Sequence, residues 1–409
     1  GSYLTSMGSY LVNVNLAGHI GIFYAMQGIV SLFMPAIMGI IADRWVPAQK
    51  LLSFSHFMAA IFMGLAGYYG MTSGQDVEFG PLFGLYALSV AFYMPTLALS
   101  NSVAYTALDK AGLDTIKHFP PIRIFGTIGF ICAMWLVDIL GLQNNYGQFF
   151  TCAIIGLVYG CYALTLPACP TSKGGQSKSL VEALGLRAFT LFKQKKMAIF
   201  FIFSMLLGVS LQITNGFANP YISSFGSIPE YADTFGVQHA NILISLSQVS
   251  ETLCILLIPF FLKRFGIKRV MLIAMLAWVF RFGFFALGNP GSGVWLFVLS
   301  MLVYGVAFDF FNVSGSLFVD KETDISIRSS AQGLFMMMTN GLGATIGTLS
   351  AQAVINRFVY ALPETASGQE VIAGWNTCWY IFAAYALVVA ALFAIFFKYK
   401  HVVKDECGR

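Results

Sequence analysis

Charged side chains are scarce in this sequence. Asp, Glu, Lys and Arg together supply 10% of the 409 residues, whereas a soluble globular domain carries about 25%. Hydrophobic residues supply 57% of the chain. Because so few charges cannot cover the surface of a soluble domain of this length, the composition excludes that class and predicts a protein embedded in a lipid bilayer.

Several motifs of enzymes are also missing. The seven cysteines include no Cys-x-x-Cys pair, so neither a disulfide framework nor a thiol redox centre is expected. No Gly-x-x-x-x-Gly-Lys-Ser/Thr loop occurs, which argues against the use of ATP. Metal-ligand clusters and Ser/His/Asp arrangements are missing as well. We therefore expect no enzyme activity, no metal and no cofactor.

What the chain does have is a series of apolar runs, each bounded by Gly, Pro or charge. A transmembrane helix needs about 20 such residues. We predict an all-α membrane protein with twelve transmembrane helices in two six-helix halves, the first helix being truncated because the sequence starts inside an apolar run. The predicted spans are residues 1–13, 19–41, 50–70, 81–106, 119–142, 147–167, 197–223, 238–262, 270–288, 293–318, 330–355 and 371–397.

The basic residues predict the orientation of these spans. All but three of the 23 Lys and Arg residues lie in alternate loops or in the C-terminal tail, and the exceptions are Arg123, Arg281 and Arg357. Cytoplasmic loops carry an excess of Lys and Arg. Both termini are therefore predicted to be cytoplasmic, in a multi-pass protein of the cytoplasmic (inner) membrane. The net charge of +5 reflects this bias, and no nucleic-acid partner is expected.

The one long internal break in the apolar pattern is the polar, basic segment 169–196. It divides the chain into an N-terminal six-helix bundle (1–168), a cytoplasmic linker (169–196), a C-terminal six-helix bundle (197–397) and a cytoplasmic tail (398–409). Within the linker, residues 179–192 have the pattern of a surface helix. Two repeated halves with a site between them near mid-membrane are typical of secondary transporters.

The predicted span 293–318 contains a carboxylate beside an aromatic face. Tyr304 and Phe308 are four residues apart and share a helical face, and Asp309 follows directly. A carboxylate at this depth is costly unless it faces protein or water. The pattern therefore predicts that these three residues line an internal cavity.

Two further spans carry polar pairs three residues apart, Gln212 with Asn215 and Gln248 with Glu251. The members of each pair share a helical face. Amide side chains both donate and accept hydrogen bonds, which suits the edges of bases and vicinal hydroxyls. Such groups can also serve only to bond helices to one another, and for any single amide that alternative stays open.

The span 119–142 carries a stripe of potential ligands, because Arg123, Thr127 and Phe130 stand at positions i, i+4 and i+7. Arg123 either serves the site or extends to the cytoplasmic headgroups. Asp138, near the outer end of the span, is expected to be in contact with water. Together the polar and aromatic residues suit an uncharged ligand with hydroxyls and a planar part that stacks on aromatic rings. A nucleoside and an aromatic glycoside both have these properties.

Coupling to a proton needs a group inside the membrane that changes its protonation state, and burial favours the neutral form of a carboxylate. Glu251 and Asp309 are the only acids well inside the predicted spans, whereas the five histidines lie in loops or toward span ends. These two acids are the candidates for carrying the proton. The alternative for one of them is a permanent ion pair with Arg281.

Four motifs resemble those of the bacterial nucleoside:proton symporters of the major facilitator superfamily: PPIRIFGTIGF (120–130), MAIFFIFSMLLG (197–208), SQVSET (247–252) and YGVAFDFFN (304–312). The likeness extends over essentially the whole chain. It implies a monomeric carrier that imports purine and pyrimidine nucleosides by proton symport with alternating access. A proton-coupled permease for a related neutral solute, such as xanthosine or another glycoside, is the alternative. The substrate-binding residues that the resemblance implies are Arg123, Thr127, Phe130, Gln212, Asn215, Gln248, Glu251, Tyr304, Phe308 and Asp309.

Two other functional classes compete with a transporter. A membrane enzyme has no motif in its favour. A passive channel or a transport-like receptor is disfavoured by the acids inside the spans and by the two-half plan, but it stays an alternative. Uptake driven by a proton gradient separates all three classes.

Overall fold

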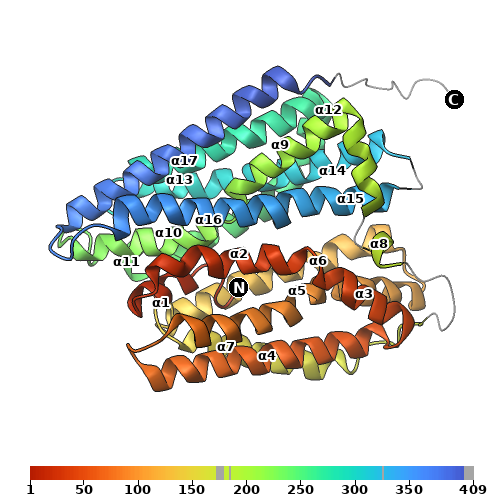
Figure 1. The fold of residues 1–409 in the computed structure, drawn as a ribbon, viewed down its shortest axis with the longest axis horizontal. Helices are drawn as coiled ribbons and strands as arrows, with labels where there is room; N and C mark the ends of the chain where they lie inside the picture. Colours follow the sequence, from red (N-terminus) through yellow and green to blue (C-terminus); the bar gives the residue numbers. More distant parts are fainter. Residues whose placement is uncertain (172–178, 184–185, 325–326, 400–409) are drawn as a thin grey trace.

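The computed structural model describes residues 1–171, 179–183, 186–324 and 327–399. Every regular element in these ranges is helical. Most helices run along one common direction and form two groups (Figure 1). Helices α1 to α8, coloured red to yellow, make up the lower group, and α9 to α17, coloured green to blue, make up the upper group.

The lower group comes from the first part of the chain. Its elements are α1 (Met7–Asn13), η1 (Ala17–His19), α2 (Ile20–Ser31), α3 (Met34–Arg44), α4 (Ala48–Ser73), α5 (Phe79–Lys110), α6 (Thr115–Ile139), α7 (Gly147–Ala163) and α8 (Leu180–Ala183). The short 3-10 helix η2 (Leu186–Lys193) follows α8. Of the predicted surface helix 179–192, the described residues form α8 and most of η2, and residues 184–185 lie outside the described residues.

The upper group comes from the second part of the chain. Its elements are α9 (Lys195–Leu211), α10 (Ile213–Ser224), η3 (Phe225–Ser227), α11 (Phe235–Gln238), α12 (Ala240–Leu287), α13 (Val294–Gly305), η4 (Val306–Phe310), α14 (Phe311–Glu322), α15 (Arg328–Met336), η5 (Met337–Gly343), α16 (Ala344–Ile355), η6 (Asn356–Tyr360) and α17 (Gly368–Phe396). Three of these, η4, η5 and η6, are π-helical segments within longer helical runs.

Within the described residues, eight helices are long and apolar enough to cross a membrane, and α7 is a shorter apolar helix. The longest, α12, covers two predicted spans, 238–262 and 270–288, and is broken at Gly266, where φ is +79°. Glycine adopts this backbone conformation without the steric penalty of a Cβ atom. The prediction of an all-α membrane protein is confirmed, whereas the count of twelve spans stays a prediction.

Two other predicted spans are interrupted. In the span 19–41, α2 ends at Ser31 and α3 begins at Met34, with Pro35 in its first turn. Proline lacks an N–H group and its ring clashes with the carbonyl four residues earlier, so it kinks or breaks a helix just before it. The span 197–223 is interrupted at Gln212, between α9 and α10.

The two groups of helices approach closely where α2 crosses α16 and η5. A Cβ atom added at Gly21 would lie 2.7 Å from the carbonyl oxygen of Thr348, and one added at Gly28 would lie 2.9 Å from that of Gly341. The N–H of Gly21 also donates to Oε1 of Gln352 at 2.7 Å. Only glycine permits this approach, as is common where membrane helices cross.

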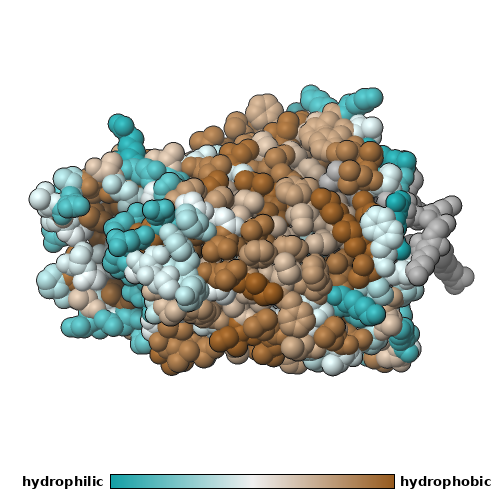
Figure 2. Space-filling model, turned by 60° about the horizontal axis from the view of Figure 1, so that its bottom comes forward, coloured by the Kyte–Doolittle hydropathy of each residue, from teal (hydrophilic) through white to brown (hydrophobic). Residues whose placement is uncertain are grey.

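The surface has the distribution of polarity that a bilayer requires. Figure 2 shows a broad hydrophobic band across the middle of one face of the molecule, with hydrophilic residues gathered at both ends. Large apolar side chains such as Phe125, Ile139 and Leu256 are strongly exposed. In water such a surface would be unfavourable, whereas lipid solvates it.

Candidate functional site

The predicted carboxylate Asp309 lies in the π-helical segment η4, which packs against α12. Such segments are rare and often occur at functional sites. The side chain is only 5% exposed, and its Oδ2 atom is buried without a hydrogen-bond partner among the described residues. A charged oxygen in this position is costly. The arrangement therefore suits a carboxylate that binds a proton or a ligand.

The aromatic face next to Asp309 is formed by two stacked rings. The ring centroids of Tyr304 and Phe308 are 5.7 Å apart and their planes differ by 14°, as the four-residue spacing predicts. Tyr304 is buried, and its ring meets that of Trp278 edge-on at 6.0 Å. Phe308 is half-buried. Of the two rings, that of Phe308 is therefore the more available to a ligand.

Arg281, on the part of α12 that follows Gly266, contacts the aromatic face at Tyr304. Its side chain is 2% exposed, and the guanidinium lies 4.6 Å from the centroid of the Tyr304 ring. Nη2 donates to Oγ1 of Thr214 on α10 at 2.9 Å, and Nη1 donates to the carbonyl of Ser300 on α13 at 2.9 Å. The sequence shows an arginine in the middle of an apolar span, which is typical of a functional residue, but it does not show that this arginine contacts the aromatic face.

The permanent ion pair considered for Arg281 is not formed in this structure. Among the described residues, neither Glu251 nor Asp309 makes a salt bridge with it. The guanidinium is satisfied by hydroxyl and carbonyl oxygens and by aromatic rings instead. Both acids are therefore free to serve the site.

The two predicted polar pairs differ in their place in the helices and in their burial. Nδ2 of Asn215 donates to Oε1 of Gln212 at 2.8 Å, at the junction of α9 and α10. Both side chains are half-buried. On α12, Gln248 is buried and Glu251 is half-buried. No hydrogen bond joins the pair of α10 to the pair of α12 within the described chain.

Residues of α6 complete the predicted set from the other half of the chain. Arg123 is exposed, and Thr127 and Phe130 are half-buried. Helix α6 packs against α12, which holds Glu251, and η4, which holds Asp309, packs against α12 as well. The three charged residues of the predicted site thus lie on α12 and on two elements that contact it.

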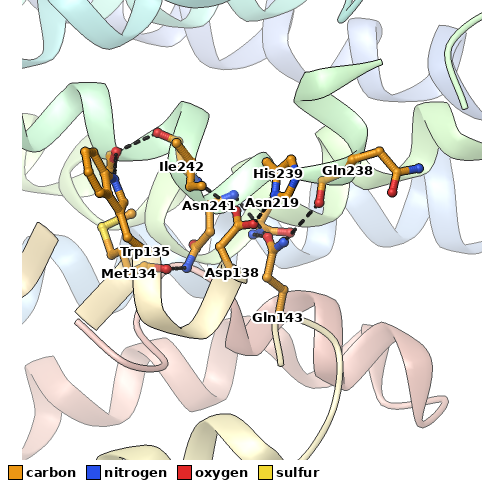
Figure 3. A network of polar contacts seen from close by, with 10 residues as sticks. Met134, Trp135, Asp138, Gln143, Asn219, Gln238, His239, Asn241 and Ile242 are labelled. Atoms are coloured by element: carbon orange, nitrogen blue, oxygen red, sulfur yellow. Dashed lines mark hydrogen bonds and ion pairs between the residues drawn. The ribbon is translucent and has the colours of Figure 1, made fainter. Parts of the chain in front are cut away.

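The expectation that Asp138 is in contact with water is wrong. The side chain is 3% exposed, and it is bonded to His239 and to the backbone N–H of Ile242 at the start of α12 (Figure 3). The sequence places Asp138 near a span end but does not show that another helix covers it there.

The family model described as "Nucleoside H+ symporter" matches residues 1–402. The xanthosine permease of Escherichia coli (strain K12) is 47% identical over 404 residues, covering 98% of this chain and 93% of the relative. The nucleoside permease NupG of the same strain is 47% identical over 405 residues, with the same coverage. A crystal structure of NupG superposes with a TM-score of 0.87 at 46% identity, covering 98% of this chain and 95% of that one.

Proposed function

Because the chain belongs to the nucleoside H+ symporter family, we propose that it imports purine and pyrimidine nucleosides across the cytoplasmic membrane by alternating access. The protein is a membrane transporter that couples the transport of nucleosides to that of protons, and it is not an enzyme. The direction of transport, the range of nucleosides and the roles of individual residues belong to the proposal.

The proposed architecture is that of the major facilitator superfamily, with twelve spans as a six-helix bundle (1–168), a cytoplasmic linker (169–196), a second bundle (197–397) and a cytoplasmic tail (398–409). The break in α12 at Gly266 supports two spans within that helix. The two helix groups of Figure 1 support the division into halves. We further propose that both termini are cytoplasmic and that the carrier works as a monomer.

We place the nucleoside between the halves, beside the acids of α12 and η4. The observation that carries this placement is the packing of α12, which holds Glu251, against α6 and η4, the elements that hold Arg123 and Asp309. Phe308, with Tyr304 and Phe130, is proposed to stack on the base. The proposed polar contacts are made by Arg123, Thr127, Gln212, Asn215, Gln248, Glu251 and Asp309.

Glu251 is the proposed proton carrier, and Asp309 is the second candidate. Glu251 shares a helical face with Gln248, so it can bond the solute and exchange a proton at one place. Asp309 lies next to Phe308, the proposed stacking residue, so its proposed role is a polar contact with the bound nucleoside.

Uptake into proteoliposomes tests the proposal. An imposed pH difference, acidic outside, should concentrate labelled uridine and adenosine inside, and a panel of unlabelled nucleosides should compete. Xanthosine is included because one relative is named a xanthosine permease. If xanthosine were the only nucleoside that competed, the protein would be a xanthosine permease and not a general nucleoside carrier. Equilibration without accumulation would indicate a channel.

Truncating the proposed stacking residue should weaken binding. Phe308→Ala is expected to raise the nucleoside Kd about fivefold to 150-fold, because base–aromatic stacking contributes about 1–3 kcal/mol. Phe308→Leu should recover part of the loss. Titration calorimetry on the purified protein measures the Kd. Phe260→Ala, at a strongly exposed aromatic of α12, is the control, and unchanged affinity in Phe308→Ala, Tyr304→Ala and Phe130→Ala would place the base elsewhere.

Arg123 should not be replaceable by lysine. Lysine keeps the charge but loses the planar set of donors of the guanidinium, so Arg123→Lys is expected to fold normally and to transport poorly. Initial uptake rates, normalised to the amount of protein inserted, measure this. Arg269→Lys, at an exposed arginine near the break in α12, is the control. Normal uptake by Arg123→Lys would show that this arginine only extends to the headgroups.

A further inference from the structure

Polar side chains join the two groups of helices at one end of α6. That helix begins at Thr115, shortly after Lys110, and ends at Ile139. Its last turns therefore lie far from the basic loops, at the predicted outer end of the membrane. The residues concerned, here called the outer lock, are Asp138, Gln143, Asn219, His239 and Asn241 (Figure 3).

Asp138 makes one half of the outer lock. Its Oδ1 lies 2.5 Å from Nδ1 of His239, and its Oδ2 accepts the backbone N–H of Ile242 at 2.9 Å. His239 caps the start of α12, and Ile242 lies in its first turn. A buried carboxylate from one half of the chain is thus bonded to the N-terminal end of a helix from the other half, where negative charge is favoured.

Gln143 makes the other half. Its Oε1 accepts from the backbone N–H of Asn241 at 3.0 Å and from Nδ2 of Asn219 at 3.3 Å. Nδ2 of Asn241 donates back to the carbonyl of Met134 on α6 at 3.0 Å. Four more hydrogen bonds join the halves here: Trp135 Nε1 to Ser245 Oγ (2.7 Å), Thr5 Oγ1 to Asn241 Oδ1 (2.6 Å), Ser9 Oγ to Asn219 Oδ1 (2.7 Å) and Gln143 Nε2 to the carbonyl of Gln238 (3.4 Å).

Part of the outer lock is shielded from solvent, whereas the His239 side chain is 41% exposed. Asn219 and Asn241 are both 0% exposed. A polar cavity of about 200 Å³ lies against the lock, with Ser223 and Asn144 in its wall. Because buried polar groups are costly when they lose their partners, the lock holds the halves together for as long as its bonds are intact.

The opposite end of α6 is not packed in this way. Arg123 is exposed, and Cβ atoms added at Gly126 or Gly129 would meet no other atom within 4 Å. Within the described residues, the hydrogen bonds from α6 to α12 therefore lie at the outer end of α6. This is the arrangement of a carrier that is closed to the outside.

We propose that the outer lock must break before a nucleoside can enter from outside, and that its residues set how often the carrier opens in that direction. They are positioning residues, since they act by holding α6 against α12, and the loop after α6 against α10, and need no contact with the solute. The proposal rests on the proposed transport by alternating access, but it does not depend on which residues bind the nucleoside. Experiments can therefore contradict the outer lock without contradicting the proposed binding site, and they can contradict the site without contradicting the lock.

Thiol accessibility tests this directly. Met134 lies one turn before Asp138 on α6 and is 0% exposed, so a cysteine at this position reports whether the outer end opens. In a protein whose native cysteines are replaced by serine, a membrane-impermeant maleimide is added to the outside of right-side-out vesicles carrying Met134→Cys. Adding Asp138→Ala or Gln143→Ala should speed labelling about tenfold, which corresponds to 1.4 kcal/mol.

The control is Asp76→Ala, which removes an exposed acid from another predicted outer loop and should leave the labelling rate unchanged. Gln143→Ala leaves the buried carboxylate in place, so it still tests the proposal if Asp138→Ala does not fold. Unchanged labelling with both lock variants would overturn the proposal.

A cross-link gives a second, independent test. In the double variant Asp138→Cys/His239→Cys, a short bifunctional thiol reagent that can be cleaved by a reductant should stop uptake, and reduction should restore it. Nucleoside binding to the cross-linked protein in detergent should stay within about twofold of its unlinked value, since the inner side remains open. Full-rate uptake by the cross-linked protein would show that these residues do not separate during transport.

Discussion

Replacing Glu251 with Gln is expected to abolish the accumulation of nucleoside against its gradient. Glutamine has nearly the same shape and still forms hydrogen bonds, but it is uncharged at every pH and cannot release a proton. A ligand shifts a carrier between states only through different affinities for those states. Without a titrating group on the face shared with Gln248, the pH difference has no site at which to act.

Two assays separate coupling from binding. Proteoliposomes with an imposed pH difference should show no uphill uptake by Glu251→Gln, while exchange of labelled for unlabelled nucleoside should continue. Asp309→Asn is the matched comparison, since it removes the neighbouring acid, and it should impair folding or binding more than coupling. Uphill uptake by Glu251→Gln would exclude Glu251 as the carrier, and loss of uphill uptake in Asp309→Asn with normal exchange would assign the role to Asp309.

The positions of the helices could largely be predicted from the sequence, because lipid imposes a simple rule. Each span must be apolar over about 20 residues, and this pattern does not depend on tertiary contacts. The spans 50–70 and 371–397, for example, lie within α4 and close to the bounds of α17. The helical spacing of Tyr304 and Phe308 also predicted that their rings lie on one face, and the rings stack.

What the sequence could not show depends on the neighbouring helices. The π-helical segment η4, which shifts the direction of Asp309 relative to a regular helix, has no signature in composition. The burial of Asp138 arises because the start of α12 covers it. The same holds for Arg281, whose partners Thr214 and Ser300 are distant in sequence. These are contacts between elements, and a periodic pattern describes only one element at a time.

Replacing Arg281 with Met should destabilise the protein and weaken nucleoside binding together. The guanidinium joins α10, α12 and α13 through Thr214, Ser247 and Ser300, and it lies over the ring of Tyr304. Hydrogen bonds to charged groups contribute about 1.5–3 kcal/mol each, and a desolvated cation–π contact contributes about 2 kcal/mol. Methionine keeps the bulk but provides none of these interactions.

We therefore expect Arg281→Met to lower stability by about 3 kcal/mol or more, seen as a lower midpoint of thermal unfolding in detergent. Nucleoside affinity should fall as well, because Tyr304 loses the contact that holds it against Phe308. Arg281→Lys should recover only part of both losses, since one ammonium group cannot reach Thr214 and Ser300 with the geometry of the planar guanidinium. Arg264→Met is the control, because that exposed guanidinium lies 5.8 Å from the ring of Phe265 and an exposed contact contributes about 0.5–1 kcal/mol. Equal stability of the Arg281→Met and Arg264→Met proteins would show that the buried arginine does not hold the aromatic face in place.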